Sequence, residues 1–155
     1  MSQLSYHEQE DVKNIQKLRA MIKALPLFCS DFFRGIEPRT SSRTRIAYAY
    51  DLGVFFDFLK KENPQLSKLD ISEITLDHLN NLTVTDLEEY MEYLKYHFND
   101  KNQEIINKEQ GIMRKLSSLK SFYNYFYRTE KIQNNPATLV QLPKLHEKEI
   151  IRLDI

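Results

Sequence analysis

The segment KEQGIMRKLSSLKSFYNYFYR, which runs from Lys108 to Arg128, decides the fold expected for this chain. Its apolar residues recur at spacings of four, three, four and three, at Ile112, Leu116, Leu119, Tyr123 and Phe126. This spacing places them on one face of an α-helix, because residues three and four apart lie on the same side of the helix axis. We therefore expect a helix over residues 108–128 that packs one face against a core.

The first turns of this predicted helix are basic and carry small side chains. Arg114 and Lys115 lie close to Gly111 and Ser118 in the sequence, so a polyanion can approach the backbone there. The helix N-terminus adds a partial positive charge of about half a unit through its unpaired N–H groups. Two interpretations stay open on this evidence: an anion-binding surface, or the solvated charged face that many surface helices carry.

Length and composition predict one domain with room for an extra helix or two. The chain has 155 residues, enough to bury a core without a disulfide or a structural metal. Cys29 is its single cysteine and its four histidines are scattered, so we expect no metal, no cofactor and a reducing compartment. Neither a membrane-spanning apolar run nor a signal-peptide pattern is present in the sequence. We therefore expect a soluble, cytoplasmic protein.

Three glycines, few β-branched runs and no alternating apolar segments predict an all-α fold. Helices are expected over residues 6–24, 26–35, 41–61, 85–98 and 108–128, with an irregular linker at 65–82 and a loop at 99–107. Gly35 is expected to end the second helix, and Thr85 with Glu88 to form a capping box that starts the fourth. Asp51 in the third helix is expected to be a buried or capping partner of a nearby hydroxyl or arginine.

Charge is unevenly distributed along the chain, although its 22 basic and 22 acidic residues cancel. Residues 34–45 hold four arginines against Glu37, a net charge of +3, and residues 111–131 hold five basic residues against Glu130, a net charge of +4. Residues 67–104 hold nine acidic residues against three lysines, a net charge of −6. Such polarity suits orientation on a charged partner.

Four motifs follow one another in an order that resembles a known family. They are S-x-x-T-x-x-x-Y-x-x-D-L at residues 41–52, R-K-L-S-S-L-K-S-F-Y at 114–123, N-P-A at 135–137 and P-K at 143–144. Together they resemble the N-terminal core-binding domain of tyrosine recombinases, the phage-integrase family, in its SAM-like helical form. The resemblance covers roughly residues 38–145.

The resemblance implies an orthogonal bundle of four to five helices with an extra N-terminal helix. Residues 1–37 would form that helical extension, residues 38–142 the DNA-binding domain, and residues 143–155 a linker toward a C-terminal catalytic domain that is absent here. In this family the domain forms half of a C-shaped clamp around a recombination half-site and meets other protomers on the DNA. By resemblance, the chain binds double-stranded DNA without cutting it, and the parent protein is a recombinase that acts in DNA integration or excision.

The same resemblance assigns the DNA-facing elements to the starts of the third and fifth predicted helices. The residues carried over are Ser41, Ser42, Arg43, Thr44, Arg45, Arg114, Lys115, Ser118 and Lys120, with Lys144 from the linker. Hydroxyls, arginines and backbone N–H groups at helix starts are also the groups that suit phosphate contacts. Arg39 is a further candidate, and no catalytic residue or metal ligand is expected.

The alternative function is a helical protein–protein interaction module without DNA binding, in which the Phe32–Phe33 and Tyr125–Tyr127 surfaces meet a partner helix. A free-standing enzyme is not expected, because the sequence offers no clustered acid and base, glycine-rich phosphate loop or nucleophile with a base. A further hypothesis assigns the leading helix, residues 6–24, to contacts between protomers.

Overall fold

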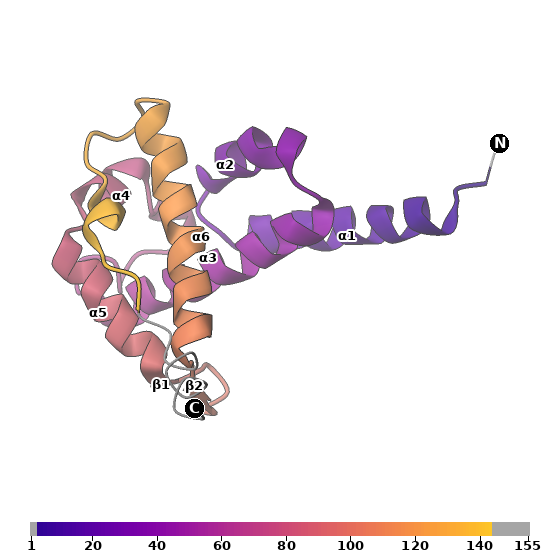
Figure 1. The fold of residues 1–155 in the computed structure, drawn as a ribbon. Coiled ribbons are helices and arrows are strands. Elements are labelled where there is room, and N and C mark those ends of the chain that lie inside the picture. The colour runs from indigo at the N-terminus through magenta and orange to yellow at the C-terminus, as the bar shows by residue number, and fades with distance from the viewer. Residues whose placement is uncertain (1–2, 144–155) are drawn as a thin grey trace, which may run out of the picture.

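Helix α6 (Glu109–Arg128) stands between α5 on one side and α2 and α3 on the other, as Figure 1 shows. The computed structural model describes residues 3–143 of the chain. All five apolar residues of the 108–128 pattern are buried. The predicted helix and its core-facing stripe are therefore confirmed.

The all-α class is also confirmed, since the described part of the chain is helical apart from one small hairpin. The other α-helices are α1 (Tyr6–Lys23), α2 (Cys29–Ile36), α3 (Ser42–Glu62), α4 (Leu76–Asn81) and α5 (Val84–Lys95). Short 3-10 turns lie at η1 (Glu37–Arg39), η2 (Ile71–Glu73) and η3 (Pro136–Leu139). α1, α3 and α6 match their predicted ranges to within one residue at each end.

Several predicted helix ends are wrong. Helix α2 begins at Cys29 rather than at residue 26. Gly35 lies inside α2, which continues to Ile36 and passes directly into η1. Helix α5 starts after Thr83 rather than at Thr85: the Thr83 hydroxyl accepts from the Asp86 N–H at 3.2 Å, and the Asp86 carboxylate accepts from the Thr83 N–H at 2.8 Å. This reciprocal pair fits the capping-box geometry two residues upstream of the predicted one.

One α-helix and both strands are not predicted by the sequence. α4 occupies part of the expected linker, and the strands β1 (Tyr96–Phe98) and β2 (Glu104–Ile106) replace the end of the fourth predicted helix and part of the loop. The strands pair antiparallel, with Tyr96 opposite Ile106. Asn102 in their connection has φ of 59°, a left-handed conformation that asparagine adopts more readily than most residues.

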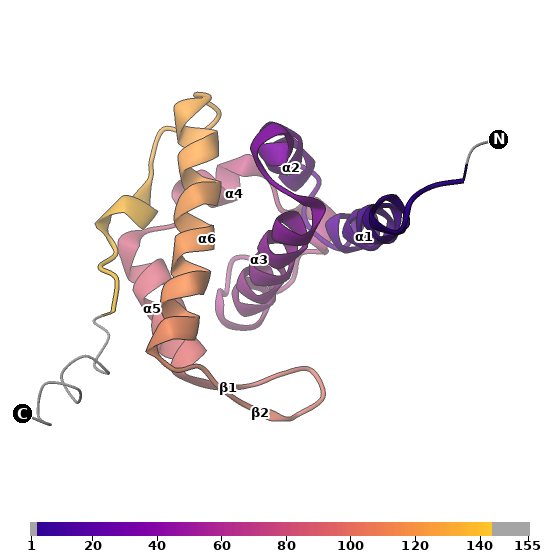
Figure 2. The same ribbon diagram turned by 45° about the vertical axis from the view of Figure 1, so that its right-hand side comes forward.

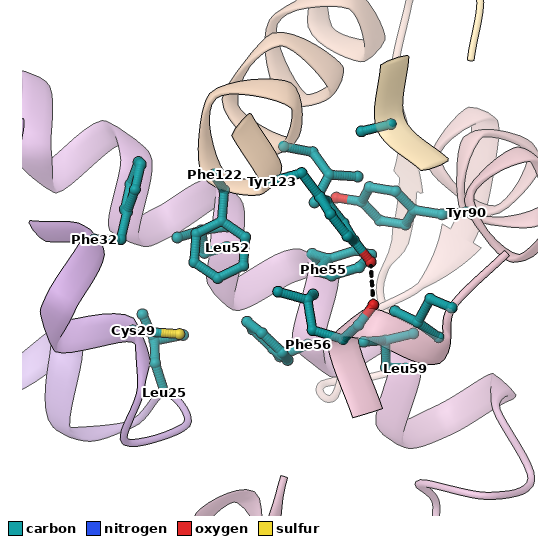
Figure 3. Close-up of a cluster of buried hydrophobic side chains, with 14 of the residues drawn as sticks. Leu25, Cys29, Phe32, Leu52, Phe55, Phe56, Leu59, Tyr90, Phe122 and Tyr123 are labelled. Atoms are coloured by element: carbon teal, nitrogen blue, oxygen red, sulfur yellow. Dashed lines mark hydrogen bonds between the residues drawn. The ribbon is translucent and has the colours of Figure 1, made fainter. Parts of the chain in front are cut away.

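The core is built from aromatic rings that meet edge to face (Figure 3). Phe122 of α6 meets Phe32 of α2 with ring centroids 5.2 Å apart, and such pairs contribute about 0.5–1.5 kcal/mol beyond their buried area. The Tyr123 hydroxyl donates to the Leu79 carbonyl at 3.0 Å, which ties α6 to α4. These contacts hold α2 and α4 against α6.

Helix α1 is attached to this core mainly through α3 and projects away from it, as both Figure 1 and Figure 2 show. Leu18, in its second half, is buried. Its first half carries Tyr6, which is 70% exposed. The N-terminal turns of α1 are therefore left without a covering element among the described residues.

Candidate nucleic-acid interface

The first turn of α3 offers hydroxyls and one arginine to solvent. Ser41 is the N-cap: its Oγ accepts from the Thr44 N–H at 3.1 Å and donates to Thr44 Oγ1 at 3.0 Å. Ser41, Arg43 and Thr44 are exposed. Because a helix N-terminus carries partial positive charge, this turn is suited to an anionic partner.

Two other predicted contact residues of the same turn point into the protein. Ser42 Oγ donates to Asp11 Oδ1 of α1 at 2.5 Å. Arg45 is buried, and its Nη1 donates to the carbonyl oxygens of Thr40 at 2.7 Å and Glu37 at 3.3 Å. Ser42 and Arg45 therefore fasten the start of α3 to α1 and to η1.

Asp51 links α3 to the basic start of α6. Its carboxylate is 2% exposed, accepts from Ser118 Oγ at 2.7 Å and pairs with Arg114 Nη2 at 3.1 Å. Arg114 Nη2 and Asp51 Oδ1 are not aligned as in a hydrogen bond, so charge attraction dominates the interaction between these two side chains. The expectation that Asp51 is a buried partner of a hydroxyl or arginine is confirmed. Arg114, 52% exposed, is thereby anchored on one side and open to solvent on the other.

The two predicted lysines of α6 make contacts within the protein. Lys115 is buried, donates to Asn107 Oδ1 at 3.2 Å and lies 5.8 Å from the centre of the Tyr50 ring. Burial lowers the pKa of Lys115, and the nearby Arg114 charge lowers it further. Lys120 donates to the Val140 carbonyl at 2.9 Å. Lys144 lies outside the described residues.

Beside these residues runs a surface that we call the interhelical surface. It consists of two neighbouring stripes that are exposed or half-buried: Arg43, Thr44, Ala47 and Tyr50 on α3, and Gln110, Arg114, Ser117, Ser121, Asn124 and Arg128 on α6. Next to the stripes, the Tyr48 hydroxyl of α3 donates to Ser121 Oγ of α6 at 3.5 Å. Neither stripe contains an acidic residue, and about half of the side chains are small, so a polyanion can lie close to both helices.

Sequence reasoning missed Ala47, Ser117, Ser121 and Asn124 as members of this surface. A signal for them exists in the sequence, because Arg114, Ser117, Ser121 and Asn124 recur at spacings of three, four and three. Helical periodicity places them beside Arg114.

The alternative function, a protein–protein interaction module, needs an exposed surface at Phe32 and Phe33. Both of these side chains are buried, so that surface is not available in full.

Other kinds of site find no support within residues 3–143. No three His, Cys, Asp or Glu side chains in that range gather as a metal site would require. None of the helices described there has the length and apolar character needed to cross a membrane.

Comparison with known proteins places the chain in a family. The tyrosine recombinase XerC of Caldanaerobacter subterraneus subsp. tengcongensis is 35% identical over 132 residues, which cover 81% of this chain. XerC of Leptospira interrogans is 35% identical over 113 residues, or 73% of this chain, and XerC of Anoxybacillus flavithermus is 30% identical over 114 residues, also 73%. The chain belongs to the tyrosine recombinase family and matches its N-terminal region.

This match confirms the resemblance predicted from the four motifs. The chain spans 35%, 30% and 31% of the lengths of these three tyrosine recombinases. No protein-family profile matches it, and no solved structure matches it.

Proposed function

We propose that this chain is the DNA-binding core-binding domain of a site-specific tyrosine recombinase, and that it clamps a recombination half-site during DNA integration or excision in the cytoplasm. Residues 38–142 would bind the duplex and residues 1–37 would extend the domain. The chain itself would bind without cleaving, while the parent protein breaks and rejoins DNA. The observation that carries the proposal is the acid-free interhelical surface with Arg43 and Arg114 on it.

The proposed contacts divide into direct and supporting residues. Ser41, Arg43, Thr44 and Arg114 have exposed groups and would meet phosphates directly. The supporting residues, which make contacts inside the protein, are Ser42, Arg45, Lys115, Ser118 and Lys120. Lys144 stays a predicted phosphate contact.

The spacing of the direct contacts suits a duplex. Arg43 and Asp51, the anchor of Arg114, are eight positions apart on α3, which corresponds to about 12 Å along the helix axis. The major groove of B-DNA is about 12 Å wide. The two arginines would therefore reach phosphates on either side of one groove, with the small side chains of the interhelical surface between them.

The salt dependence of DNA binding tests this proposal. Arg43→Ala combined with Arg114→Ala removes two proposed phosphate contacts, so the slope of log affinity against log salt should fall by about 1.8. Fluorescence anisotropy with a random-sequence duplex of about 30 base pairs at low salt measures it.

The matched control combines Lys13→Ala with Lys68→Ala, two exposed lysines outside the interhelical surface. This control should leave the slope unchanged. If the arginine variant kept the slope of the unmodified chain, or if the unmodified chain did not bind the duplex, the proposal would be wrong.

Contacts between protomers are the second part of the proposal. The observation that favours them is the uncovered start of α1, where Tyr6 and the preceding Leu4 are exposed. On DNA, these side chains would pack against a neighbouring recombinase protomer.

A further inference from the structure

The hairpin of β1 and β2 has an outer face of large apolar side chains. Tyr96, Phe98 and Ile106 are 52%, 47% and 67% exposed, while His97 and Ile105 on the other face are half-buried. The rings of Tyr96 and Phe98 meet edge to face with centroids 5.7 Å apart, and Ile106 lies opposite Tyr96. None of these three side chains is needed to fill the core.

Lysines frame this apolar face. Lys95 precedes β1, Lys101 lies in the connection and Lys108 follows β2, and all three are exposed. Of the two acidic residues in the hairpin, Asp100 pairs with Lys61 at 2.9 Å, which leaves Glu104 on the outer face. The cores of protein–protein interfaces are depleted in lysine, whereas lysines around exposed apolar side chains suit a nucleic acid.

The inner face of the hairpin faces α3. A cavity of about 210 Å³ separates them, lined on the α3 side by Tyr50, Val54, Asp57 and Lys61. The Tyr93 and His97 rings stack 4.0 Å apart at its edge, and Lys61 donates to the Phe98 carbonyl at 3.5 Å. The Lys61 side chain therefore links the hairpin to α3 across this cavity.

This position brings the hairpin next to the interhelical surface. Val54, Asp57 and Lys61 continue, at helical spacing, the α3 stripe that includes Arg43, Ala47 and Tyr50. The hairpin thus lies over the C-terminal half of the stripe whose N-terminal half is open. Figure 2 shows it projecting from the ends of α5 and α6. Its outer face and the interhelical surface are consequently presented on the same side of α3.

We propose that the hairpin is a second DNA-contacting element of this chain. Resting on the proposed function, this inference assigns Tyr96, Phe98 and Ile106 to the major groove next to the phosphates that Arg114 contacts, and Lys101 and Lys108 to flanking phosphates. A two-stranded ribbon fits the major groove, where apolar side chains meet thymine methyl groups. Lysine contacts to phosphate would add to the salt dependence of binding.

Site-specific photo-crosslinking tests the contact directly. The full 155-residue chain would carry p-benzoylphenylalanine in place of one residue and be irradiated with a labelled random-sequence duplex of about 30 base pairs at low salt. The test position is Phe98, the reference on the interhelical surface is Ala47, and the control is Leu27, which is 76% exposed and lies elsewhere. Cross-links at positions 98 and 47 but not at 27 are expected.

The outcomes separate the two proposals. A cross-link at 47 without one at 98 overturns the hairpin contact and leaves the proposed function standing. No cross-link at either position overturns both proposals. A cross-link at 27 as strong as that at 98 shows unspecific capture and also overturns the hairpin contact.

Affinity measurements give an independent readout. Tyr96→Ser with Phe98→Ser should weaken binding about tenfold without changing the salt slope, because apolar contacts release no counterions. Lys101→Ala with Lys108→Ala should lower the slope by about 1.8. The control Leu27→Ser should change neither quantity. Unchanged affinity in the first variant, with its folding verified by circular dichroism, overturns the proposal.

Discussion

At the scale of single residues, the proposed interface depends on Asp51. Its buried carboxylate accepts from the Ser118 hydroxyl and attracts the Arg114 guanidinium. A guanidinium has five N–H donors in a fixed plane. Arg114 can therefore keep its contact with Asp51 while its remaining donors stay free to reach a phosphate, so Asp51 would act as a positioning residue in the proposed DNA contact.

Substitution of Asp51 tests this role in the folded protein. Asp51→Ala leaves the Ser118 hydroxyl without its acceptor, so the free energy of unfolding should fall by about 1–3 kcal/mol. Arg114→Ala leaves Oδ1 of the buried Asp51 carboxylate without its charged partner, so it should also lower the free energy of unfolding, by about 1–3 kcal/mol. Urea denaturation measures both values.

Asp51→Asn is the matched control because its carbonyl oxygen can still accept from Ser118. It should recover part of the stability and leave Arg114 without its charged anchor, so DNA binding weakens in Asn and Ala variants alike. An unfolding free energy of Asp51→Ala equal to that of the unmodified chain would contradict the arrangement.

Sequence motifs predicted which residues lie near this proposed interface. They were less successful at predicting whether each side chain points to solvent or into the protein. Asp51 could be assigned because a carboxylate among apolar residues of a helix needs a partner. Ser42 and Arg45 could not be separated from Arg43 and Thr44, since their inward contacts come from Asp11 and from carbonyl oxygens of η1. A motif within α3 contains no information on those partners.

At the scale of elements, long helices were predictable and short elements were not. α6 shows several turns of its 3.6-residue period, whereas β1 and β2 have three residues each, too few for a period-two pattern to stand out. The start of α5 was ambiguous because Thr83–Asp86 and Thr85–Glu88 both fit a capping pattern. Burial of Leu87, Tyr90 and Leu94 fixes where this helix sits.

Two glycines within helices give a matched test of element packing. A Cβ at Gly35 would overlap the Tyr125 ring and lie 2.8 Å from its Cζ, whereas a Cβ at Gly53 would meet nothing within 4 Å. Gly35→Ala should therefore lower the free energy of unfolding by about 1–3 kcal/mol. Gly53→Ala should raise it by about 0.5–1 kcal/mol, because glycine is entropically costly in a helix.

Thermal and urea denaturation of both variants measure the difference. The pair shows whether α2 packs against α6 as closely as described. If Gly35→Ala were as stable as the unmodified chain, the close approach of the Tyr125 ring to Gly35 would be contradicted.

At the scale of the whole molecule, charge is separated between elements that lie on different sides of α6. α5 carries exposed Glu88, Glu89 and Glu92, while α3 and α6 carry the acid-free interhelical surface. α5 and α3 flank α6 from different sides in Figure 2. A neutral chain arranged in this way would meet DNA with one face, and the screening length of about 10 Å at 0.1 M salt limits repulsion from the acidic face.

The projecting helix α1 sets the last test at this scale. Leu4 and Tyr6 lie before the point where Asp11 and Leu18 attach α1 to the rest of the molecule. Leu4→Ser with Tyr6→Ser should therefore leave folding and binding to a duplex with room for one chain unchanged. On a duplex with room for two chains, the variant should bind without cooperativity, because a protomer contact through this apolar surface would be lost. Sedimentation velocity on the two duplexes distinguishes one bound chain from two, and Leu139→Ser, at another exposed leucine, should keep the cooperativity. If the double variant bound the longer duplex as cooperatively as the unmodified chain, α1 would have no part in joining protomers and another surface would have to provide that contact.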